Sequence, residues 1–230
     1  MCGRYSLAAD QMALSLAFPD FHIPDAFPKR YNIAPTQYVP AVLNTKNLSV
    51  DLLYWGLIPS WAKDPAIGNK LINARSETLT EKPSFKNAFR RRRCLLLADG
   101  FYEWRRLPDG KTKIPTRITL QNRAPFALAG LWEQWSHPGG SEIWSCTILT
   151  TEPNELMAPI HNRMPVILHP EDYSLWLDPR ERSAADLMPL LGPYEAAAMT
   201  AYTVSTTVNN AANDSPVCIE PAFDNDLRLF

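Results

Sequence analysis

The second residue, Cys2, has a chemistry that depends on its position in the chain. Removal of Met1, which is common before a small residue, would give Cys2 a free α-amine with a pKa of about 7.7–8.0 beside a thiol of about 8.5. The amine forms a Schiff base with an aldehyde, and the thiol then closes a five-membered thiazolidine ring, which an N-terminal Ser could not form. Position 2 alone does not establish this role, because a Cys at an unstructured terminus would look the same.

The other cysteines suggest no metal chemistry. Cys94 and Cys146 lie in apolar, strand-like runs and are predicted to be small core residues. No CxxC pair occurs, so neither a zinc site nor another metal or cofactor is predicted. The start of the chain lacks the pattern of a secretory signal, and no apolar run approaches the ~18 residues of a membrane helix. We therefore expect reduced thiols in a cytoplasmic protein without a membrane partner.

Several sequence blocks accompany Cys2, and together they resemble one protein family. In chain order they are Met1-Cys2-Gly3-Arg4-Tyr5, Arg30-Tyr31-Asn32-Ile33-Ala34-Pro35-Thr36, Trp55-Gly56-Leu57-Ile58-Pro59-Ser60-Trp61, Ile72-Asn73-Ala74-Arg75-Ser76-Glu77-Thr78, Arg93-Cys94-Leu95, Ala98-Asp99-Gly100-Phe101-Tyr102-Glu103-Trp104 and Ile160-His161-Asn162-Arg163-Met164-Pro165-Val166. In this order and spacing they resemble the SRAP (SOS response-associated peptidase) family. The resemblance runs from Cys2 to about Asn210, and predicts an SRAP domain over 1–210 followed by a C-terminal tail, 211–230, of unknown packing.

The resemblance implies a function in the SOS and DNA damage responses. SRAP proteins bind abasic sites in single-stranded DNA and crosslink to them through the N-terminal Cys. An abasic deoxyribose opens to an aldehyde, so the chemistry expected of Cys2 agrees with the activity of the family. The thiazolidine shields the lesion from strand-cleaving β-elimination, and the resemblance implies an enzyme with abasic-site crosslinking and lyase-like activity. The family name also implies a peptidase activity, the self-removal of Met1 with Cys2 as nucleophile.

Further roles are carried over from the matching blocks. Asn73 would hydrogen-bond the sugar or the crosslink. Arg75 and Arg4 would hold the phosphates that flank the lesion, and Arg163 is a weaker phosphate contact. The alternatives are a turn-capping role for Asn73 and a surface ion pair for an arginine, for instance between Arg75 and Glu77.

Glu103 and His161 are the expected acid–base pair. Glu103 lies between two aromatic residues, where a carboxylate should have a raised pKa suited to moving protons. His161 has a near-neutral pKa suited to opening and reforming the sugar ring. Without the family match, Glu103 would be interpreted as a solvent-facing strand residue and His161 as a structural histidine.

Charge and aromatic residues predict a DNA-binding face. The net charge is −1, but residues 60–93 contain nine Lys/Arg and three Asp/Glu, a balance of +6. Such a segment attracts phosphate backbones whatever the total charge. Trp61 is expected to be exposed and to stack beside the lesion in single-stranded or junction DNA, whereas Trp55 is expected in the core. The Arg90-Arg91-Arg92-Arg93 run either adds to the basic face or is a solvated helix end.

The elements that must position these residues indicate an α+β fold. The chain has 230 residues, 46% of them hydrophobic, with 21 Pro and 9 Gly. These proportions favour one domain, expected to be monomeric, with a curved, mainly antiparallel sheet or barrel and short peripheral helices. Strands are predicted at 38–43, 49–55, 94–98, 100–104, 113–120, 126–132, 143–150, 164–168 and 199–205, and helices at 10–18, 85–93, 154–158, 170–177 and 183–191.

Two other functions remain open from the residues alone. One is an N-terminal-nucleophile amidase or cysteine protease that uses Cys2, His161 and Glu103. The other is a reader of modified bases that binds without using the thiol. The basic segment and Trp61 argue against the amidase, because a small amide substrate requires neither.

Overall fold

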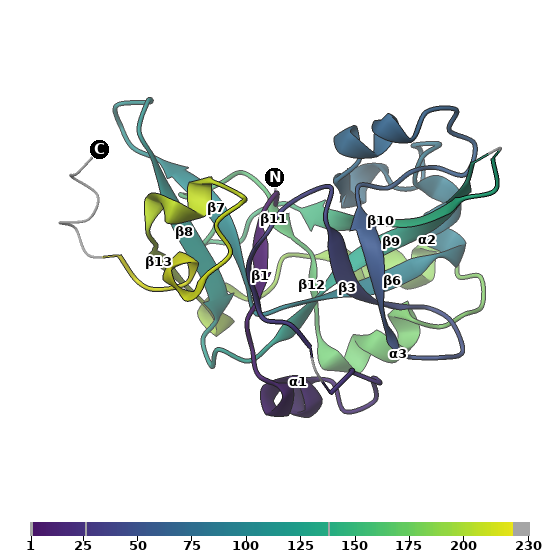
Figure 1. The fold of residues 1–230 in the computed structure, drawn as a ribbon, viewed down its shortest axis with the longest axis horizontal. Helices are drawn as coiled ribbons and strands as arrows, with labels where there is room; N and C mark the ends of the chain where they lie inside the picture. Colours follow the sequence, from purple (N-terminus) through teal and green to yellow (C-terminus); the bar gives the residue numbers. More distant parts are fainter. Residues whose placement is uncertain (1, 26, 138, 223–230) are drawn as a thin grey trace.

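The computed structural model describes residues 2–25, 27–137 and 139–222. The chain is an α+β domain of two mainly antiparallel sheets, as the sequence predicted, with short helices around them. Figure 1 shows β1 between β7, β8 and β13 on the left and the larger sheet on the right. The start of the chain lies at the upper end of β1, and α1 lies below its lower end.

The regular elements are short. The strands are β1 (Tyr5–Leu7), β2 (Arg30–Ile33), β3 (Tyr38–Leu43), β4 (Val50–Trp55), β5 (Asn73–Arg75), β6 (Arg93–Ala98), β7 (Gly100–Arg106), β8 (Lys113–Leu120), β9 (Phe126–Ser136), β10 (Glu142–Thr151), β11 (Met164–Pro165), β12 (Ile167–Leu168) and β13 (Met199–Thr203). The α-helices are α1 (Gln11–Ala17), α2 (Lys86–Arg91), α3 (Tyr173–Trp176) and α4 (Ala184–Leu187). The 3-10 helices are η1 (Pro65–Lys70), η2 (Ser76–Thr78), η3 (Pro170–Asp172), η4 (Met188–Leu191), η5 (Ala196–Ala198), η6 (Thr206–Asn209) and η7 (Pro216–Cys218).

Strand pairing closes the larger sheet into a barrel. The smaller sheet has the order β13-β8-β7-β1-β2, and the larger one β11-β10-β4-β3-β6-β9-β12. Because β9 also pairs with β10, the strands β10, β4, β3, β6 and β9 form a closed ring. The short β5 pairs with β10 in parallel, which brings the 73–75 segment to the barrel rim.

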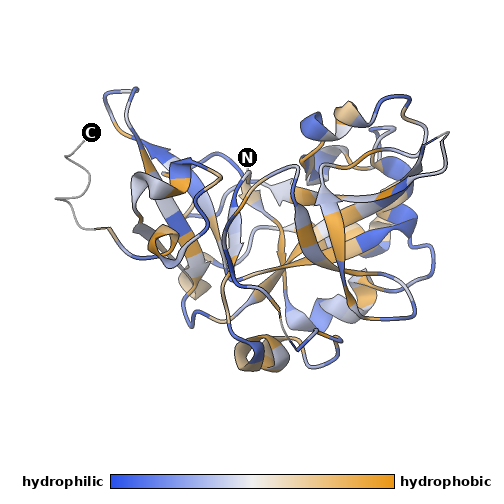
Figure 2. Cartoon of the chain, in the orientation of Figure 1, coloured by the Kyte–Doolittle hydropathy of each residue, from blue (hydrophilic) through white to orange (hydrophobic). Residues whose placement is uncertain are grey.

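The barrel interior carries most of the hydrophobic core. All six residues of β6 are buried, and hydrophobic residues gather on the barrel strands in Figure 2. Gly130 of β9 is required at this position, because a Cβ there would lie 2.4 Å from Leu96 Cδ1 and 2.9 Å from the Thr147 carbonyl oxygen. Cys94 and Cys146 are fully buried among these strands, which confirms their predicted core role.

The predicted strands and most predicted helices are present, with one clear exception. Residues 154–158 form turns rather than the expected helix. The Ala158 N–H donates to the Asn154 carbonyl oxygen as in a helix, but Pro159 has no N–H to continue the ladder. The short strands β1, β2 and β5 were not predicted.

The segment after Asn210 packs on the domain as far as Ala222. Asp214 accepts hydrogen bonds from Arg30 Nε at 2.5 Å and from the Asn32 N–H at 3.0 Å. Cys218 is buried, and Pro221 forms a β-bridge with Val204. The rest of the expected tail, 223–230, lies outside the described residues. Within the described ranges, no helix is long and apolar enough to span a membrane, and no cluster of side chains fits a metal ion.

Candidate active site

Cys2 lies three residues before Tyr5, the first residue of β1, and is fully buried. Its neighbours are set by the antiparallel pairing of β1 with β7, in which Tyr5 lies opposite Phe101 and the Tyr102 N–H donates to the Arg4 carbonyl oxygen at 2.9 Å. Continued by two residues, this register places Glu103 beside the segment that leads to Cys2. Met1, whose removal the sequence predicts, lies outside the described residues.

Asn73 touches Cys2 directly. The Asn73 Nδ2 donates a 2.8 Å hydrogen bond to the Cys2 carbonyl oxygen. Asn73 is the first residue of β5, which is fixed against β10 by the pairing of Asn73 with Ile148. The Asn73 Oδ1 is buried and has no hydrogen-bond partner among the described residues, so this acceptor remains available to a ligand.

Glu103 and His161 come together from distant parts of the sequence. The His161 Nδ1 lies 4.0 Å from the Glu103 Oε1. The Glu103 side chain is almost fully buried, whereas that of His161 is partly exposed. The His161 Nδ1 lies 3.1 Å from the Arg163 backbone nitrogen and 3.2 Å from the Arg163 carbonyl oxygen, so the backbone of Arg163 orients the ring.

Burial shifts the proton affinities of all three groups. It raises the pKa of the Glu103 carboxyl to about 7 and lowers the pKa of His161. Burial, together with the charge of Glu103, raises the pKa of the Cys2 thiol to about 12. At neutral pH the site therefore holds a protonated thiol beside a carboxyl group that gains and loses protons readily.

The predicted phosphate-binding arginines differ in their surroundings. Arg75 is exposed, and its side chain forms no hydrogen bond or ion pair within the described ranges. Arg4 is half-buried and donates to Asn32 Oδ1 at 2.7 Å and to the Val208 carbonyl oxygen at 2.6 Å. Its guanidinium lies 5.7 Å from the centre of the Trp104 ring.

Arg163 forms an ion pair with Glu77, so its guanidinium is not free to bind a phosphate. Its two Nη atoms donate to the two Glu77 carboxylate oxygens at 2.6 and 2.9 Å, and Nη2 also donates to the Thr150 carbonyl oxygen at 2.6 Å. The ion pair considered for Arg75 and Glu77 is thus formed by Arg163, which leaves Arg75 as the exposed cation beside Asn73.

The two tryptophans are placed as predicted. Trp55 is fully buried, lies edge-on to Tyr5 at 5.3 Å, and donates from Nε1 to the Ile72 carbonyl oxygen. Trp61 is 59% exposed at the tip of the loop between β4 and η1.

The arginine run is a solvated helix end only in its first half, because Arg90 and Arg91 are exposed in the last turn of α2 whereas Arg92 and Arg93 are not. Arg90 and Arg91 both form ion pairs with Glu181, and Arg92 pairs with Glu133 at 2.8 Å. Arg93 is fully buried. Its guanidinium donates to five backbone carbonyl oxygens, those of Phe89, Arg90, Trp176, Asp178 and Arg180.

A buried polar network, which was not predicted, holds β1, the strand that follows Cys2. Asp99 accepts from Ser6 Oγ at 2.6 Å, from the Ala8 N–H at 2.7 Å and from Arg117 Nη2 at 2.9 Å. A Cβ at Gly100 would lie 2.8 Å from the Arg117 guanidinium, so a larger residue there would displace this guanidinium from the network. The sequence signal for this network was the Asp99-Gly100 pair inside one of the family blocks. The partners of Asp99 lie on or beside β1 and β8, far away in the chain, so the network itself could not be predicted.

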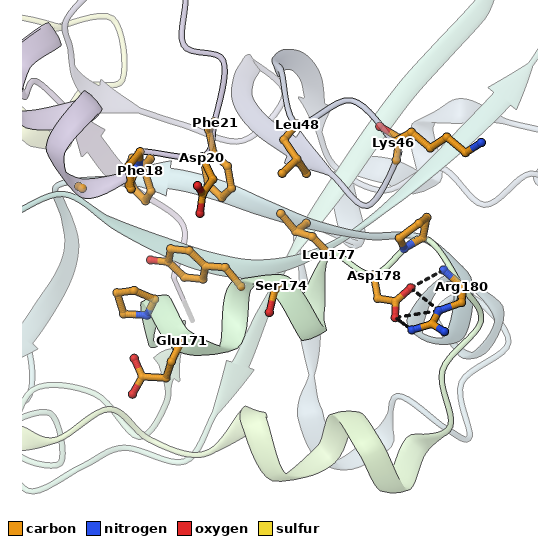
Figure 3. Close-up of a pocket in the computed structure, with 16 residues that line it drawn as sticks. Phe18, Asp20, Phe21, Lys46, Leu48, Glu171, Ser174, Leu177, Asp178 and Arg180 are labelled. Atoms are coloured by element: carbon orange, nitrogen blue, oxygen red, sulfur yellow. Dashed lines mark hydrogen bonds and ion pairs between the residues drawn. The ribbon is translucent and has the colours of Figure 1, made fainter.

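A cavity of about 1020 Å³ lies away from this site, between the end of α1 and α3 (Figure 3). Its walls include Phe18, Phe21, Leu48 and Tyr173, and none of the predicted site residues line it. Figure 1 places α1 and α3 at the lower side of the molecule and the start of β1 at the upper side. This cavity is therefore separate from the site at Cys2.

Comparisons with known proteins agree with this geometry. Residues 1–211 match the family described as SOS response associated peptidase (SRAP). The Bacillus subtilis protein named abasic site processing protein YoqW is 48% identical over 223 residues, which cover 96% of this chain and 99% of that protein. The rat abasic site processing protein HMCES is 32% identical, covering 96% of this chain and 76% of that protein. A crystal structure of a Bacteroides thetaiotaomicron protein, 29% identical, has a TM-score of 0.85 and covers 96% of this chain and 100% of its own. The chain therefore belongs to the SRAP family.

Proposed function

We propose that this protein captures abasic sites in single-stranded DNA by forming a covalent thiazolidine through Cys2. The observation that carries the proposal is the cluster at the start of β1, where Cys2 is held by Asn73 and lies beside the Glu103–His161 pair. The names of the relatives, abasic site processing proteins, support the same substrate. The protein would act as a monomer in the cytoplasm, or at the nucleoid of a bacterial cell.

The reaction requires the α-amine of Cys2 to be free. In the unprocessed chain this nitrogen is part of the Met1–Cys2 peptide bond and cannot attack an aldehyde. We propose that the Cys2 thiol attacks the Met1 carbonyl carbon, which transfers the acyl group from nitrogen to sulfur and releases the amine. Water then hydrolyses the thioester, releasing Met and restoring the thiol. This step would be the peptidase activity that the family name describes.

Capture of the sugar begins with ring opening and Schiff-base formation. The abasic deoxyribose is mostly a closed hemiacetal, so a proton must reach the ring oxygen as the hydroxyl proton leaves. A His161 imidazole that has taken up a proton can deliver it to the ring oxygen and return to its neutral form. The Cys2 amine then adds to the aldehyde. Glu103, with a pKa of about 7, accepts the proton lost by the amine and returns it to the departing hydroxyl as water.

Closure of the ring depends on the thiol. With a pKa raised to about 12, the Cys2 thiol keeps its proton until the moment of attack on the Schiff base. The Glu103 carboxylate can receive that proton while the sulfur–carbon bond forms. Closure is favoured because amine and thiol belong to one residue. The product has lost the imine through which strand-cleaving β-elimination proceeds.

Arg75 and Trp61 would make the main contacts with the DNA, and Arg4 and Arg163 would support them. Arg75 is exposed and uncommitted among the described residues, so it can pair with a phosphate. The exposed Trp61 ring can stack on a base or fill the gap at the lesion, in a single strand or at a junction with duplex. The internal bonds of Arg4 and Arg163 suggest that these two order the site and contact phosphates only secondarily.

A denaturing gel tests the proposal. An abasic single strand should give a slowly migrating adduct with the wild-type protein and none with Cys2→Ala, and an undamaged strand should give none with either. Non-covalent binding with no adduct would instead favour a modified-base reader. Cleavage of small amides with no affinity for DNA would favour an amidase.

A further inference from the structure

The loop that carries Trp61 is fastened to the β9–β10 hairpin by side chains. The Ile58 N–H donates to Ser145 Oγ at 2.9 Å, and Trp135 Nε1 donates to the Ala62 carbonyl oxygen at 2.7 Å. Ser145 lies opposite Glu133 in the hairpin, and Trp135 is two residues further along β9. Side chains at these three positions point to the same face of the hairpin, the face that the loop covers.

Glu133 lies at the centre of this attachment. Its side chain is 8% exposed, and its Oε2 forms an ion pair with Arg92 Nη2 at 2.8 Å. Burial raises the pKa of Glu133, while Arg92 and the backbone N–H groups of Gln134 and Ser60 act in the opposite direction. Since Glu133 lies between Ser145 and Trp135 on this face, its carboxylate lies under the middle of the loop, near Ser60.

The start of the loop is fixed by a contact between two glycines. Gly56 has a φ of +144°, and a Cβ there would lie 2.7 Å from the Gly68 carbonyl oxygen in η1. The loop is therefore held at Gly56, Ile58 and Ala62, while the Trp61 ring remains exposed. An aromatic ring fixed before binding loses less conformational entropy when a base stacks on it.

We propose that Glu133 is a positioning residue for DNA binding: paired with Arg92, it supports the loop between the attachments at Ser145 and Trp135 and so keeps the Trp61 ring in place to stack at the lesion. The proposal rests on the proposed function, in which Trp61 contacts DNA. It gives Arg92 a role inside the fold, supporting a DNA contact rather than making one.

Hydrogen exchange measured by mass spectrometry tests the attachment without DNA. In Glu133→Ala, the amides of residues 58–62 should exchange about tenfold faster than in wild type, because a charge-assisted contact is lost. Trp135→Phe, which keeps the ring but loses the bond to Ala62, should shift exchange in the same direction. Glu181→Ala is the matched control, because it removes the partner of Arg90 and Arg91 but should leave exchange in the loop unchanged.

A double-mutant cycle tests the link to DNA. Loss of stacking in Trp61→Ala should weaken equilibrium affinity for an abasic single strand by about 5- to 150-fold. Glu133→Ala should weaken it by part or all of that factor, and Glu133→Gln, which retains one acceptor, by less. In the Trp61→Ala background, Glu133→Ala should have no further effect, whereas general damage to the fold would multiply the two effects.

Three results would overturn the proposal. The first is unchanged exchange in Glu133→Ala, and the second is multiplicative effects in the cycle. The third is wild-type affinity in Trp61→Ala, which would show that the attachment does not serve DNA binding. Adduct formation by Cys2, followed on a denaturing gel in the same samples, reports separately on the proposed function.

Discussion

The Asn73 side-chain amide donates a 2.8 Å hydrogen bond to the Cys2 carbonyl oxygen, which ties the start of the chain to the β5–β10 side of the barrel. The other end of the Asn73 amide, Oδ1, is buried with no partner in the described part of the chain. In the proposed reaction, one side chain would therefore hold Cys2 and accept a hydrogen bond from the sugar at the same time.

Replacing Asn73 should slow adduct formation more than it weakens DNA binding. Asn73→Asp removes the donor to Cys2 and sets a charge against its carbonyl oxygen, so we expect it to be slower than Asn73→Ala. Loss of one such hydrogen bond corresponds to about a tenfold change in rate. Quenched-gel kinetics at saturating protein, beside anisotropy titrations, measure the two effects. Equal losses of rate and affinity would show that Asn73 only binds DNA.

Glu103 and His161 should control the rate of chemistry rather than affinity. General acid–base catalysis contributes about 10²–10⁴-fold, so Glu103→Gln and His161→Ala should each slow crosslinking or its reversal by a factor in that range. Their affinity for abasic DNA should stay close to wild type. If both variants react and reverse at wild-type rates, the two side chains are structural.

Because its carboxyl group is buried, Glu103 should lower the free energy of unfolding as the pH rises. Its pKa is raised to about 7 by burial, so the folded protein favours the protonated form. Relative to Glu103→Gln, wild type should therefore lose stability progressively as the pH rises from about 4.5 to 7, with no further loss above it. Thermal denaturation at pH 5 and pH 8 should show the variant gaining in Tm over wild type at the higher pH. A Tm difference independent of pH would contradict the raised pKa.

The salt dependence of DNA binding should distinguish a phosphate contact by Arg75 from one by the Arg90-Arg91-Arg92-Arg93 run. Because Arg75 is exposed and unpaired within the described ranges, Arg75→Ala should weaken binding to all sequences alike and reduce the slope of log K against log salt by about one unit. Arg91→Ala, whose arginine is occupied by Glu181, is the control and should leave the slope unchanged. A larger change of slope for Arg91→Ala than for Arg75→Ala would place the DNA against the arginine run instead of beside Arg75.

The longer elements of the fold were predictable because they carry their own signal. Strands such as β6 and β8 are long enough to show a buried run or an alternation. The three residues of β1 and of β5 show neither, and they are strands only because β7 and β10 pair with them. Pairing partners distant in sequence are not visible in a short segment.

The candidate residues and the raised pKa of Glu103 could be predicted from the sequence, whereas the ion pairs of the arginines could not. Cys2, Asn73, Glu103 and His161 could be chosen from the family blocks, and the structure brings Asn73 to Cys2 and His161 to Glu103. The choice of Arg163 over Arg75 as the partner of Glu77 depends on β5 and the 163 segment meeting at β10. Arg93 looks solvated in a run of four arginines, yet it is buried because backbone carbonyl oxygens from the end of α2, from α3 and from the segment after α3 converge on it.

The intact mass of the protein, alone and after reaction with an abasic oligonucleotide, tests the central claim most directly. Wild type alone should have lost Met1. After reaction it should have gained the mass of the oligonucleotide less one water molecule, as thiazolidine formation requires. Cys2→Ala should give no such stable adduct. The same adduct on Cys2→Ala, or on wild type that still carries Met1, would contradict capture through the Cys2 amine and thiol.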